Sequence, residues 1–229
     1  MMSSSLSVRD AAPTAGEYLW ISFKSAVYIG FRGDSAFLKY WEDVADKTAL
    51  PVECLWTVYL AAKQCLHVEG DFWECGVDRG GSAKFIAMTI AGRGKALHLF
   101  DTFSGMPAAR SDIDWHKEGD FSTVDIADAA AFVGGDDTSF HKGLIPATFA
   151  GMESSRIAFA HVDLDIYQST LDACAFIYPR LSRGAMMVLD DYGRPSCKGV
   201  RQAVDEFFGD KPERPIPNLT SAQALVFKL

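Results

Sequence analysis

Short apolar runs alternate with segments of helical periodicity along most of the chain from Asp71 onward. Such runs are typical of buried strands, whereas apolar positions three or four residues apart are typical of helices that cover a sheet. The candidate strands are 71–77, 95–103, 138–143, 156–165, 184–193 and 222–229, and the candidate helices are 82–92, 124–134, 168–181 and 199–209. This alternation predicts an α/β fold with a doubly wound, mostly parallel sheet.

Three further segments complete the predicted organisation. Residues 34–68 carry apolar positions at helical spacing on both sides of Pro51, which predicts two helices before the first strand. Residues 104–123 form a long polar stretch after the second strand, and we expect it to act as a lid or substrate loop. Residues 1–33 are expected to be a tail or assembly arm, and 34–229 a single domain.

Composition favours one enzyme-sized domain that does not bind nucleic acid. The chain has 229 residues, 48% of them hydrophobic, which is enough for one well-filled core. The formal net charge is −8, and the Lys and Arg residues are scattered singly, without the basic stripe that a phosphate backbone requires. We therefore expect a small-molecule substrate and no nucleic-acid partner.

Several features indicate a cytoplasmic protein with no membrane segment. No apolar run approaches the roughly 18–20 residues that a membrane helix needs, and the first residues lack the pattern of a secretion signal. The five cysteines are odd in number and include no C-x-x-C pair, so we interpret them as reduced core thiols. Apolar residues in the predicted N-terminal helices, such as Trp41, Trp56 and Tyr59, favour a homo-oligomer.

The stretch "ECGVDRGGSAKF" (74–85) follows the first predicted strand and opens a helix. Ligands of α/β sheets bind at such turns. Gly76 lets the backbone approach a ligand, and Ser82 offers a hydroxyl near the helix N-terminus. Glu74 and Asp78 bring negative charge, which repels a diphosphate and suits a cation such as a sulfonium with an amino-acid tail. The alternative is a tight strand-to-helix turn that binds nothing.

A second acid lies at the end of the second predicted strand, in "LFDTF". A carboxylate in the position of Asp101 can accept both ribose hydroxyls, although it could instead cap a loop. With the aromatic Phe103 beside it and the glycine turn before it, Asp101 favours an adenosine ligand with a positive charge. This describes S-adenosylmethionine better than NAD.

Two carboxylate pairs stand at the ends of the next two strands, in "HVDLDIYQST" and "VLDDYG". Residues i and i+2 share a face, so Asp163 and Asp165 should be neighbours. Strands joined by one helix usually lie side by side, which brings Asp190 and Asp191 to the same edge. Four carboxylates in a partly dry cleft cannot all stay ionised without a cation. An all-oxygen site suits Mg²⁺, or Ca²⁺ if larger, and suits zinc less because only His161 is adjacent.

Two other interpretations of these acids remain open. In the first, Asp190 and Asp191 cap turns, while Asp163 and Asp165 pair with arginines, the candidates being Arg156, Arg180 and Arg201. In the second, "DLD" is the D-x-D motif of a glycosyltransferase that holds Mn²⁺ against a nucleotide-sugar diphosphate. D-x-D alone is a weak motif.

Five blocks of the sequence together resemble the macrocin O-methyltransferase (TylF-type) family. They are "ECGVDRGGS", "LFDTFSGMP", "HKEGDFS", "HVDLDIYQSTLDACAFIYPRLSRGAMMVLDDYG" and "CKGVRQAVDEFF", within about residues 48–209. The resemblance implies a seven-stranded Rossmann-like class I methyltransferase sheet. It also implies dependence on S-adenosylmethionine and Mg²⁺, with transfer to a hydroxyl of a sugar in a natural product.

The resemblance also assigns residue roles. It places Asp163, Asp190 and Asp191 on the metal and makes Asp165 the base, with His161 and His116 as weaker candidates for that role. The expected cofactor contacts are Glu74, Gly76, Ser82, Asp101, Phe103, Ser122 and Asp163. We expect the acceptor to be a glycoside or a catechol-like diol whose vicinal oxygens chelate the metal.

Overall fold

The computed structural model describes residues 30–122 and 124–229. It divides into two units, Met1–Ser35 and Ala36–Leu229. The described part of the first unit is the short 3-10 helix η1 (Gly30–Gly33), after which α2 (Ser35–Val44) begins. The rest of the predicted arm lies outside the described residues.

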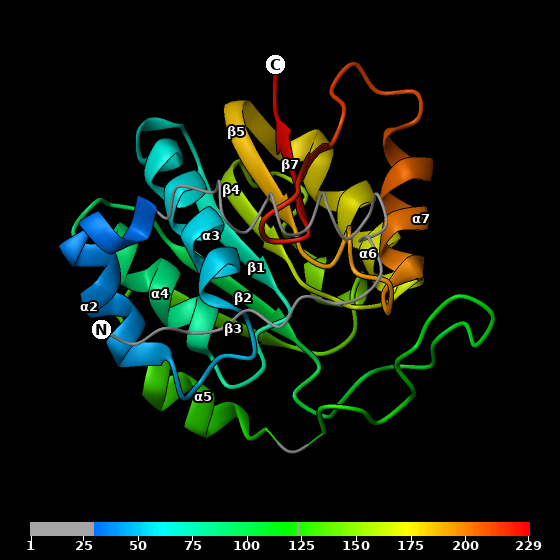
Figure 1. Cartoon of the computed structure of the whole chain (residues 1–229), viewed down its shortest axis with the longest axis horizontal. Coiled ribbons are helices and arrows are strands. Elements are labelled where there is room, and N and C mark those ends of the chain that lie inside the picture. The colour runs from blue at the N-terminus through cyan, green and yellow to red at the C-terminus, as the bar shows by residue number, and fades with distance from the viewer. Residues whose placement is uncertain (1–29, 123) are drawn as a thin grey trace, which may run out of the picture. The chain divides into compact units, whose positions relative to one another are not determined.

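The second unit is built around a seven-stranded sheet of order β3-β2-β1-β4-β5-β7-β6 (Figure 1). Its strands are β1 (Asp71–Cys75), β2 (Leu97–Asp101), β3 (Thr138–Lys142), β4 (Ile157–Val162), β5 (Leu181–Leu189), β6 (Ile216–Asn218) and β7 (Gln223–Phe227). The first five strands are parallel, and β7 is antiparallel to both β5 and β6. The predicted doubly wound, mostly parallel sheet is confirmed.

Helices cover both faces of this sheet (Figure 1). They are α2, α3 (Val52–Gln64), α4 (Gly81–Ile90), α5 (Ile126–Val133), α6 (Tyr167–Ile177) and α7 (Lys198–Phe208). One buried cluster joins α3, α4 and α5 to the sheet through residues such as Val58, Ile86 and Ala129. The other joins α6 and α7 to the opposite face through residues such as Ala173 and Val204. No described helix is both long and apolar enough to cross a membrane.

Most predicted elements end within one to four residues of the observed ends, and two differences have a clear physical cause. The edge strand β6 was not among the candidate strands, because three residues that include Pro217 carry no alternation to detect. Strand β5 begins at Leu181, where the apolar periodicity predicts the end of a helix. Pro179 explains this difference: α6 ends at Ile177, and a 3-10 turn, η4 (Tyr178–Arg180), leads directly into the strand.

The sheet has a topological switch point beside β1. The chain runs outward from β1 through β2 to β3 and then returns to place β4 on the other side of β1. At such a point the two connections leave in opposite directions and open a crevice at the carboxyl ends of the strands. The fold therefore locates a ligand site before any side chain is considered.

Candidate active site

One row of residues crosses the sheet at the carboxyl ends of four neighbouring strands: it holds the last residue of β2 and the residues directly after β1, β4 and β5. The register aligns Phe100 with Cys75, Cys75 with Val162, and Val162 with Leu189. The residues that follow are therefore neighbours in the same order: Asp101, Gly76, Asp163 and Asp190. Parallel pairing thus joins the glycine turn to both carboxylate pairs, as the sequence predicted.

Within this row, the backbones of Gly76 and Asp163 lie in close contact. The Asp163 N–H donates to the Cys75 carbonyl at 2.8 Å, and the Gly76 N–H donates to the Phe100 carbonyl at 2.9 Å. Gly76 has a φ of +89°, and a Cβ built on it would lie 1.7 Å from the Asp163 carbonyl oxygen. Only glycine fits this position, because a side chain would need both a left-handed backbone and space that β4 occupies.

The carboxylate of Asp101 holds the glycine turn in place. Its Oδ2 accepts hydrogen bonds from the Val77 N–H at 2.8 Å and the Asp78 N–H at 3.1 Å. Its Oδ1 accepts one from the Phe103 N–H at 2.8 Å. Each carboxylate oxygen has further lone pairs, so Asp101 can order the turn and still accept a ligand hydroxyl.

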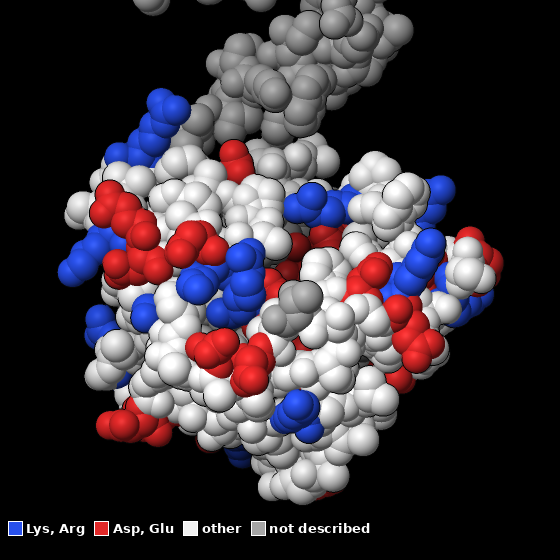
Figure 2. Space-filling view, turned by 90° about the horizontal axis from the view of Figure 1, so that it is seen from below, with Lys and Arg blue, Asp and Glu red and all other residues white. Residues whose placement is uncertain are grey.

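A cavity of about 330 Å³ lies over this row, within the range of small-molecule sites. The predicted residues that line it are Gly76, Ser82, Asp101, Phe103, His116, Asp163, Asp165, Asp190 and Asp191. Figure 2 shows acidic side chains recessed in a hollow of this face, with Lys and Arg side chains at its rim. The structure thus brings together most of the predicted site in one cavity.

Three of its carboxylates are close enough to share a cation. Asp163, Asp165 and Asp191 each offer one oxygen, and these atoms lie within 4.8 Å of one another. Asp165 and Asp191 both have a φ of +59°, and Asp is one of the few residues that visits this left-handed region. The same backbone turn after β4 and β5 therefore directs the second acid of each pair into the cavity. The family resemblance instead implied that Asp190 is the third metal ligand and that Asp165 is the base.

Burial and the charges of neighbouring carboxylates raise the pKa values of Asp163, Asp165 and Asp190. Burial is the main cause for Asp163, whose pKa lies well above its usual range, with the charge of Asp190 next. Burial and a hydrogen bond with Asp191 raise the pKa of Asp165 to about 8. Burial raises that of Asp190 to about 6, although the neighbouring His161 opposes this shift. The ionised forms of these buried carboxylates are therefore unfavourable without a counter-charge.

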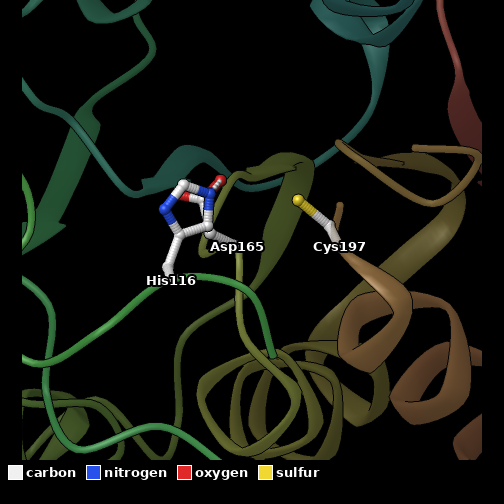
Figure 3. Close-up of side chains that lie close together, drawn as sticks. All are labelled: His116, Asp165 and Cys197. Atoms are coloured by element: carbon white, nitrogen blue, oxygen red, sulfur yellow. Dashed lines mark ion pairs between the residues drawn. The ribbon is translucent and has the colours of Figure 1, made fainter. Parts of the chain in front are cut away.

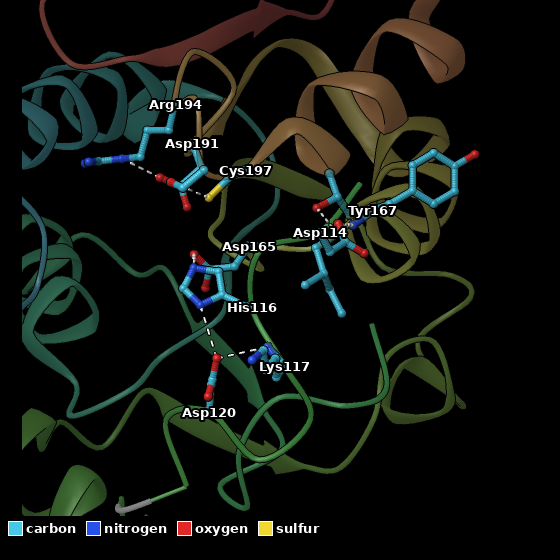
Figure 4. Close-up of polar contacts among 12 residues, drawn as sticks. Asp114, His116, Lys117, Asp120, Asp165, Tyr167, Asp191, Arg194 and Cys197 are labelled. Atoms are coloured by element: carbon cyan, nitrogen blue, oxygen red, sulfur yellow. Dashed lines mark hydrogen bonds and ion pairs between the residues drawn. The ribbon is translucent and has the colours of Figure 1, made fainter. Parts of the chain in front are cut away.

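One arginine that the sequence analysis did not single out partly compensates this charge. Arg194 Nε lies 2.5 Å from Asp191 Oδ1 (Figure 4). The three arginines considered from sequence have other partners: Arg156 pairs with Glu69, Arg180 donates to the Phe176 carbonyl, and Arg201 pairs with Asp205. The interpretation in which those three neutralise the carboxylates is therefore wrong.

Three predicted residues do not line the cavity. Glu74 and His161 are fully buried between β1 and β4, with His161 Nδ1 2.8 Å from Glu74 Oε1. Burial alone would lower the pKa of His161, but the hydrogen bond and charge of Glu74 raise it overall. Neither residue lines the cavity, so the structure does not place either of them against a ligand. Ser122 is exposed and also lies off the cavity.

His116 reaches the cavity from the long segment between β2 and α5. Its Nε2 lies 3.6 Å from Asp165 Oδ1, and its Nδ1 lies 3.6 Å from Asp120 Oδ2. Figure 4 shows the ring between these two carboxylates. This segment therefore contributes a titratable side chain directly beside the acid cluster.

Asp114 fixes this segment to the rest of the fold. Its Oδ1 accepts a hydrogen bond from the N–H of Tyr167, the first residue of α6, at 2.9 Å, and its Oδ2 accepts one from the Arg110 N–H at 2.9 Å. The helix has no side-chain cap of its own, so Asp114 supplies the acceptor and the negative charge that its N-terminus favours. A Cβ at Gly199 in α7 would lie 1.9 Å from Asp114 Oδ1. Glycine at this position therefore leaves the space that the Asp114 carboxylate occupies.

We expect Asp114→Ala to release this anchor. Loss of a helix cap should lower the free energy of unfolding by about 1 kcal/mol, and the segment carrying His116 should be cut faster by protease. Chemical denaturation and limited proteolysis measure the two effects. Asp112→Ala is the matched control, because Asp112 lies in the same segment, is exposed and pairs only with Arg110 among described partners. Equal behaviour of the two variants would contradict the anchoring role.

Several cavity residues were not found from sequence. Thr48, Leu50 and Pro51 come from the connection between α2 and α3, and Ser196 and Cys197 come from the turn before α7. All five cysteines are free and buried, as predicted. Cys197 differs from the predicted core thiols because it also lines the cavity. No sequence pattern marks these positions, since only the packing of distant loops brings them together.

The family model described as "Macrocin-O-methyltransferase (TylF)" matches residues 59–218, which include β1 to β6 and every carboxylate of the site. This chain belongs to the macrocin-O-methyltransferase (TylF) family. The resemblance inferred from the five sequence blocks is thereby confirmed.

Curated proteins and solved structures are also similar to this chain. The chain is 31% identical over 157 residues to the 8-demethyl-8-(2,3-dimethoxy-alpha-L-rhamnosyl)-tetracenomycin-C 4'-O-methyltransferase of Streptomyces olivaceus, covering 62% of this chain and 59% of that protein. It is 30% identical over 159 residues to the mycinamicin III 3''-O-methyltransferase of Micromonospora griseorubida, covering 61% of each. The chain thus matches about three fifths of the length of these curated relatives.

The fold itself is shared with the solved structure of the O-methyltransferase NovP. The TM-score is 0.70 at 23% identity, and the match covers 80% of this chain and 82% of that one. The seven-stranded sheet with its switch point at β1 is therefore the fold of known O-methyltransferases.

Proposed function

We propose that this protein is a Mg²⁺-dependent O-methyltransferase that moves a methyl group from S-adenosylmethionine to a hydroxyl of a glycosylated small molecule. The observation that carries the proposal is the row of Asp101, Gly76, Asp163 and Asp190 under one cavity. This row puts a pocket suited to a nucleoside sulfonium directly beside a carboxylate cluster suited to a cation and an acceptor.

The β1–β2 half of the cavity supports the cofactor assignment. Gly76 removes the side chain that would block the crevice, and Asp101 presents a carboxylate at the carboxyl end of β2, where α/β folds bind ribose. Ser82 and the N-terminus of α4 lie where a ligand carboxylate would find donors. Asp163 and Asp78 bring negative charge toward the position of a cationic centre.

The β4–β5 half of the cavity fits a hard divalent cation. Its ligands would come from Asp163, Asp190 and Asp191, with Asp165 adjacent. Four carboxylates face one arginine, Arg194, among the described residues that line the cavity here, and burial has raised the pKa values of Asp163, Asp165 and Asp190. An oxygen-only donor set of this kind is typical of Mg²⁺.

Methyl transfer from a sulfonium is an in-line displacement, so the protein must orient the acceptor, take its proton and exclude water. A bound Mg²⁺ would lower the pKa of the acceptor hydroxyl. Asp165 is the proposed base, because it lines the cavity beside the cation ligands and its raised pKa favours proton uptake. Met106, Phe121 and Leu144 line the same cavity and would shield the reacting atoms from solvent.

The acceptor class rests on the relatives. The two curated proteins described above are named as O-methyltransferases of a rhamnosyl tetracenomycin and of mycinamicin III. A sugar hydroxyl with a vicinal oxygen also suits chelation by a cation on Asp163, Asp190 and Asp191. A catechol-like diol offers the same pair of oxygens and is the second acceptor class to test.

Isothermal titration calorimetry provides the test. We expect S-adenosylhomocysteine to bind and UDP- and GDP-sugars not to bind, with product formation from a glycoside panel abolished by excess EDTA and restored by Mg²⁺. Binding of a nucleotide sugar with Mn²⁺ would instead support the glycosyltransferase interpretation. Cofactor binding without metal-dependent turnover of any glycoside or catechol would contradict the proposed reaction.

A further inference from the structure

A second set of donor atoms overlaps the carboxylate cluster. His116, Asp165 and Cys197 each offer one ligand atom, and these three atoms lie within 4.8 Å of one another. They come from three separate places: the segment after β2, the connection from β4 to α6, and the turn before α7. Figure 3 shows the sulfur of Cys197 directed toward the side on which His116 and Asp165 meet. All three residues line the cavity.

The spacing of the His116 and Asp165 atoms suits tetrahedral coordination. Zinc binds nitrogen, oxygen and sulfur at about 2.0–2.3 Å, which places tetrahedral ligand atoms about 3.3–3.8 Å apart. The distance from His116 Nε2 to Asp165 Oδ1 is 3.6 Å. The sulfur lies no more than 4.8 Å from the other two atoms, so it needs a movement of about 1 Å to complete three ligands.

The other ring nitrogen of His116 faces a carboxylate. Asp120 Oδ2 lies 3.6 Å from His116 Nδ1, and the Lys117 N–H holds the same oxygen at 2.9 Å. Histidines that bind metals usually present their second N–H to a carboxylate or carbonyl, which fixes the ring and its tautomer. Asp120 lies on the correct side of the ring for this arrangement, at ion-pair distance, and Nε2 faces Asp165 on the other side.

The thiol distinguishes this donor set from a magnesium site. Cys197 is 2% exposed, and burial followed by the charge of Asp191 raises its pKa to about 12. A thiophilic cation displaces the proton of a coordinating thiol to solvent, whereas Mg²⁺ takes oxygen ligands only. The sequence counted only His161 as a nearby soft ligand, but tertiary packing brings His116 and Cys197 instead.

We propose that His116, Asp165 and Cys197 form a binding site for a thiophilic divalent cation, with Zn²⁺ as the natural occupant. A cation bound to both His116 and Asp165 would link the segment after β2 to the edge of the sheet. It would also inhibit methyl transfer by engaging the base. This inhibition rests on the proposed function, whereas metal binding itself does not.

Cobalt substitution tests the site without measuring turnover. Addition of Co²⁺ to the reduced protein should give a thiolate-to-cobalt charge-transfer band in the near ultraviolet at one equivalent, and Zn²⁺ should remove it by displacement. Cobalt held by carboxylates alone gives no such band, so occupation of the Asp163 and Asp191 cluster cannot mimic the result.

Variants assign the ligands. Cys197→Ser and His116→Ala should each lose the band, and Asp120→Asn should weaken Zn²⁺ binding about 10–100-fold in a competition titration. Cys54→Ser is the matched control, because Cys54 is a second buried thiol whose hydrogen bond to the Ser221 carbonyl a serine can replace. Circular dichroism checks that each variant is folded.

The outcomes separate the two proposals. Absence of the band in the wild-type protein, or its survival in folded Cys197→Ser, would overturn the zinc site and leave the methyltransferase proposal intact. A band that depends on Cys197 and His116 without any methyl transfer by the protein would support the site and count against the proposed function.

Discussion

Asp191→Asn is expected to lower methyl transfer by about 10³-fold or more, while S-adenosylhomocysteine binds with an affinity within a few-fold of the wild type. Asp191 is 5% exposed and shares the acid cluster with Asp163 and Asp165. The substitution removes one negative charge with almost no change of shape. Asn also tolerates the φ of +59° at this position, so the backbone turn should persist.

The assay follows product formation from a glycoside by mass spectrometry, with cofactor binding measured separately by calorimetry. Asp205→Asn is the matched control, because Asp205 also pairs with an arginine, Arg201, but lies exposed on α7. Undiminished turnover in Asp191→Asn, or full wild-type activity in excess EDTA, would rule out the cation at this cluster.

Gly76→Ala is expected to have the largest effect on the fold itself. Its added methyl group would lie 1.7 Å from the Asp163 carbonyl oxygen, and β1 and β4 are hydrogen-bonded at this level and cannot separate cheaply. We expect the free energy of unfolding to fall by about 4 kcal/mol or more, among the large effects of single substitutions. Protein that still folds should lose detectable binding of S-adenosylhomocysteine, because the crevice floor must shift.

Gly151→Ala separates the two causes of this loss. Gly151 has a φ of +84°, close to that of Gly76, but a Cβ there would meet nothing within 4 Å. Gly151→Ala should lower the free energy of unfolding only by the backbone strain of an alanine at positive φ, about 1 kcal/mol. Urea denaturation compares the two variants. Similar losses in both would mean that the close approach of β1 and β4 is not what requires glycine at position 76.

Much of the fold could be predicted because its strands and helices follow from local patterns of apolar residues. Buried parallel strands are short continuous apolar runs, and the helices between them show a periodic apolar face, so both leave a signal within a few residues. The signal fails where the element is too short, as in β6, or where one residue interrupts the pattern, as Pro179 does between α6 and β5. These failures affect the rim of the sheet and not its order.

The carboxylate site was predictable for a related reason. Parallel strands end at one edge, so residues just beyond different strands become neighbours once the strand order is known. From sequence, this placed the two acid pairs together and the glycine turn and Asp101 at the same edge. The strand order and register that set Gly76, Asp101, Asp163 and Asp190 in one row came from the structure. The same reasoning failed for Glu74 and His161, because it identifies the strand end but not which way a side chain one residue earlier points.

By itself, the sequence determined the α/β class, the parallel sheet and the meeting of the glycine turn with the two acid pairs, because these follow from strand periodicity and strand ends. Only the tertiary structure decided which groups complete the site. Arg194, His116, Cys197 and the Asp114 anchor come from loops whose positions depend on packing against distant elements. Local sequence patterns do not encode such long-range contacts. The arginine counter-charge and the sulfur and nitrogen donors therefore could be identified only from the tertiary structure.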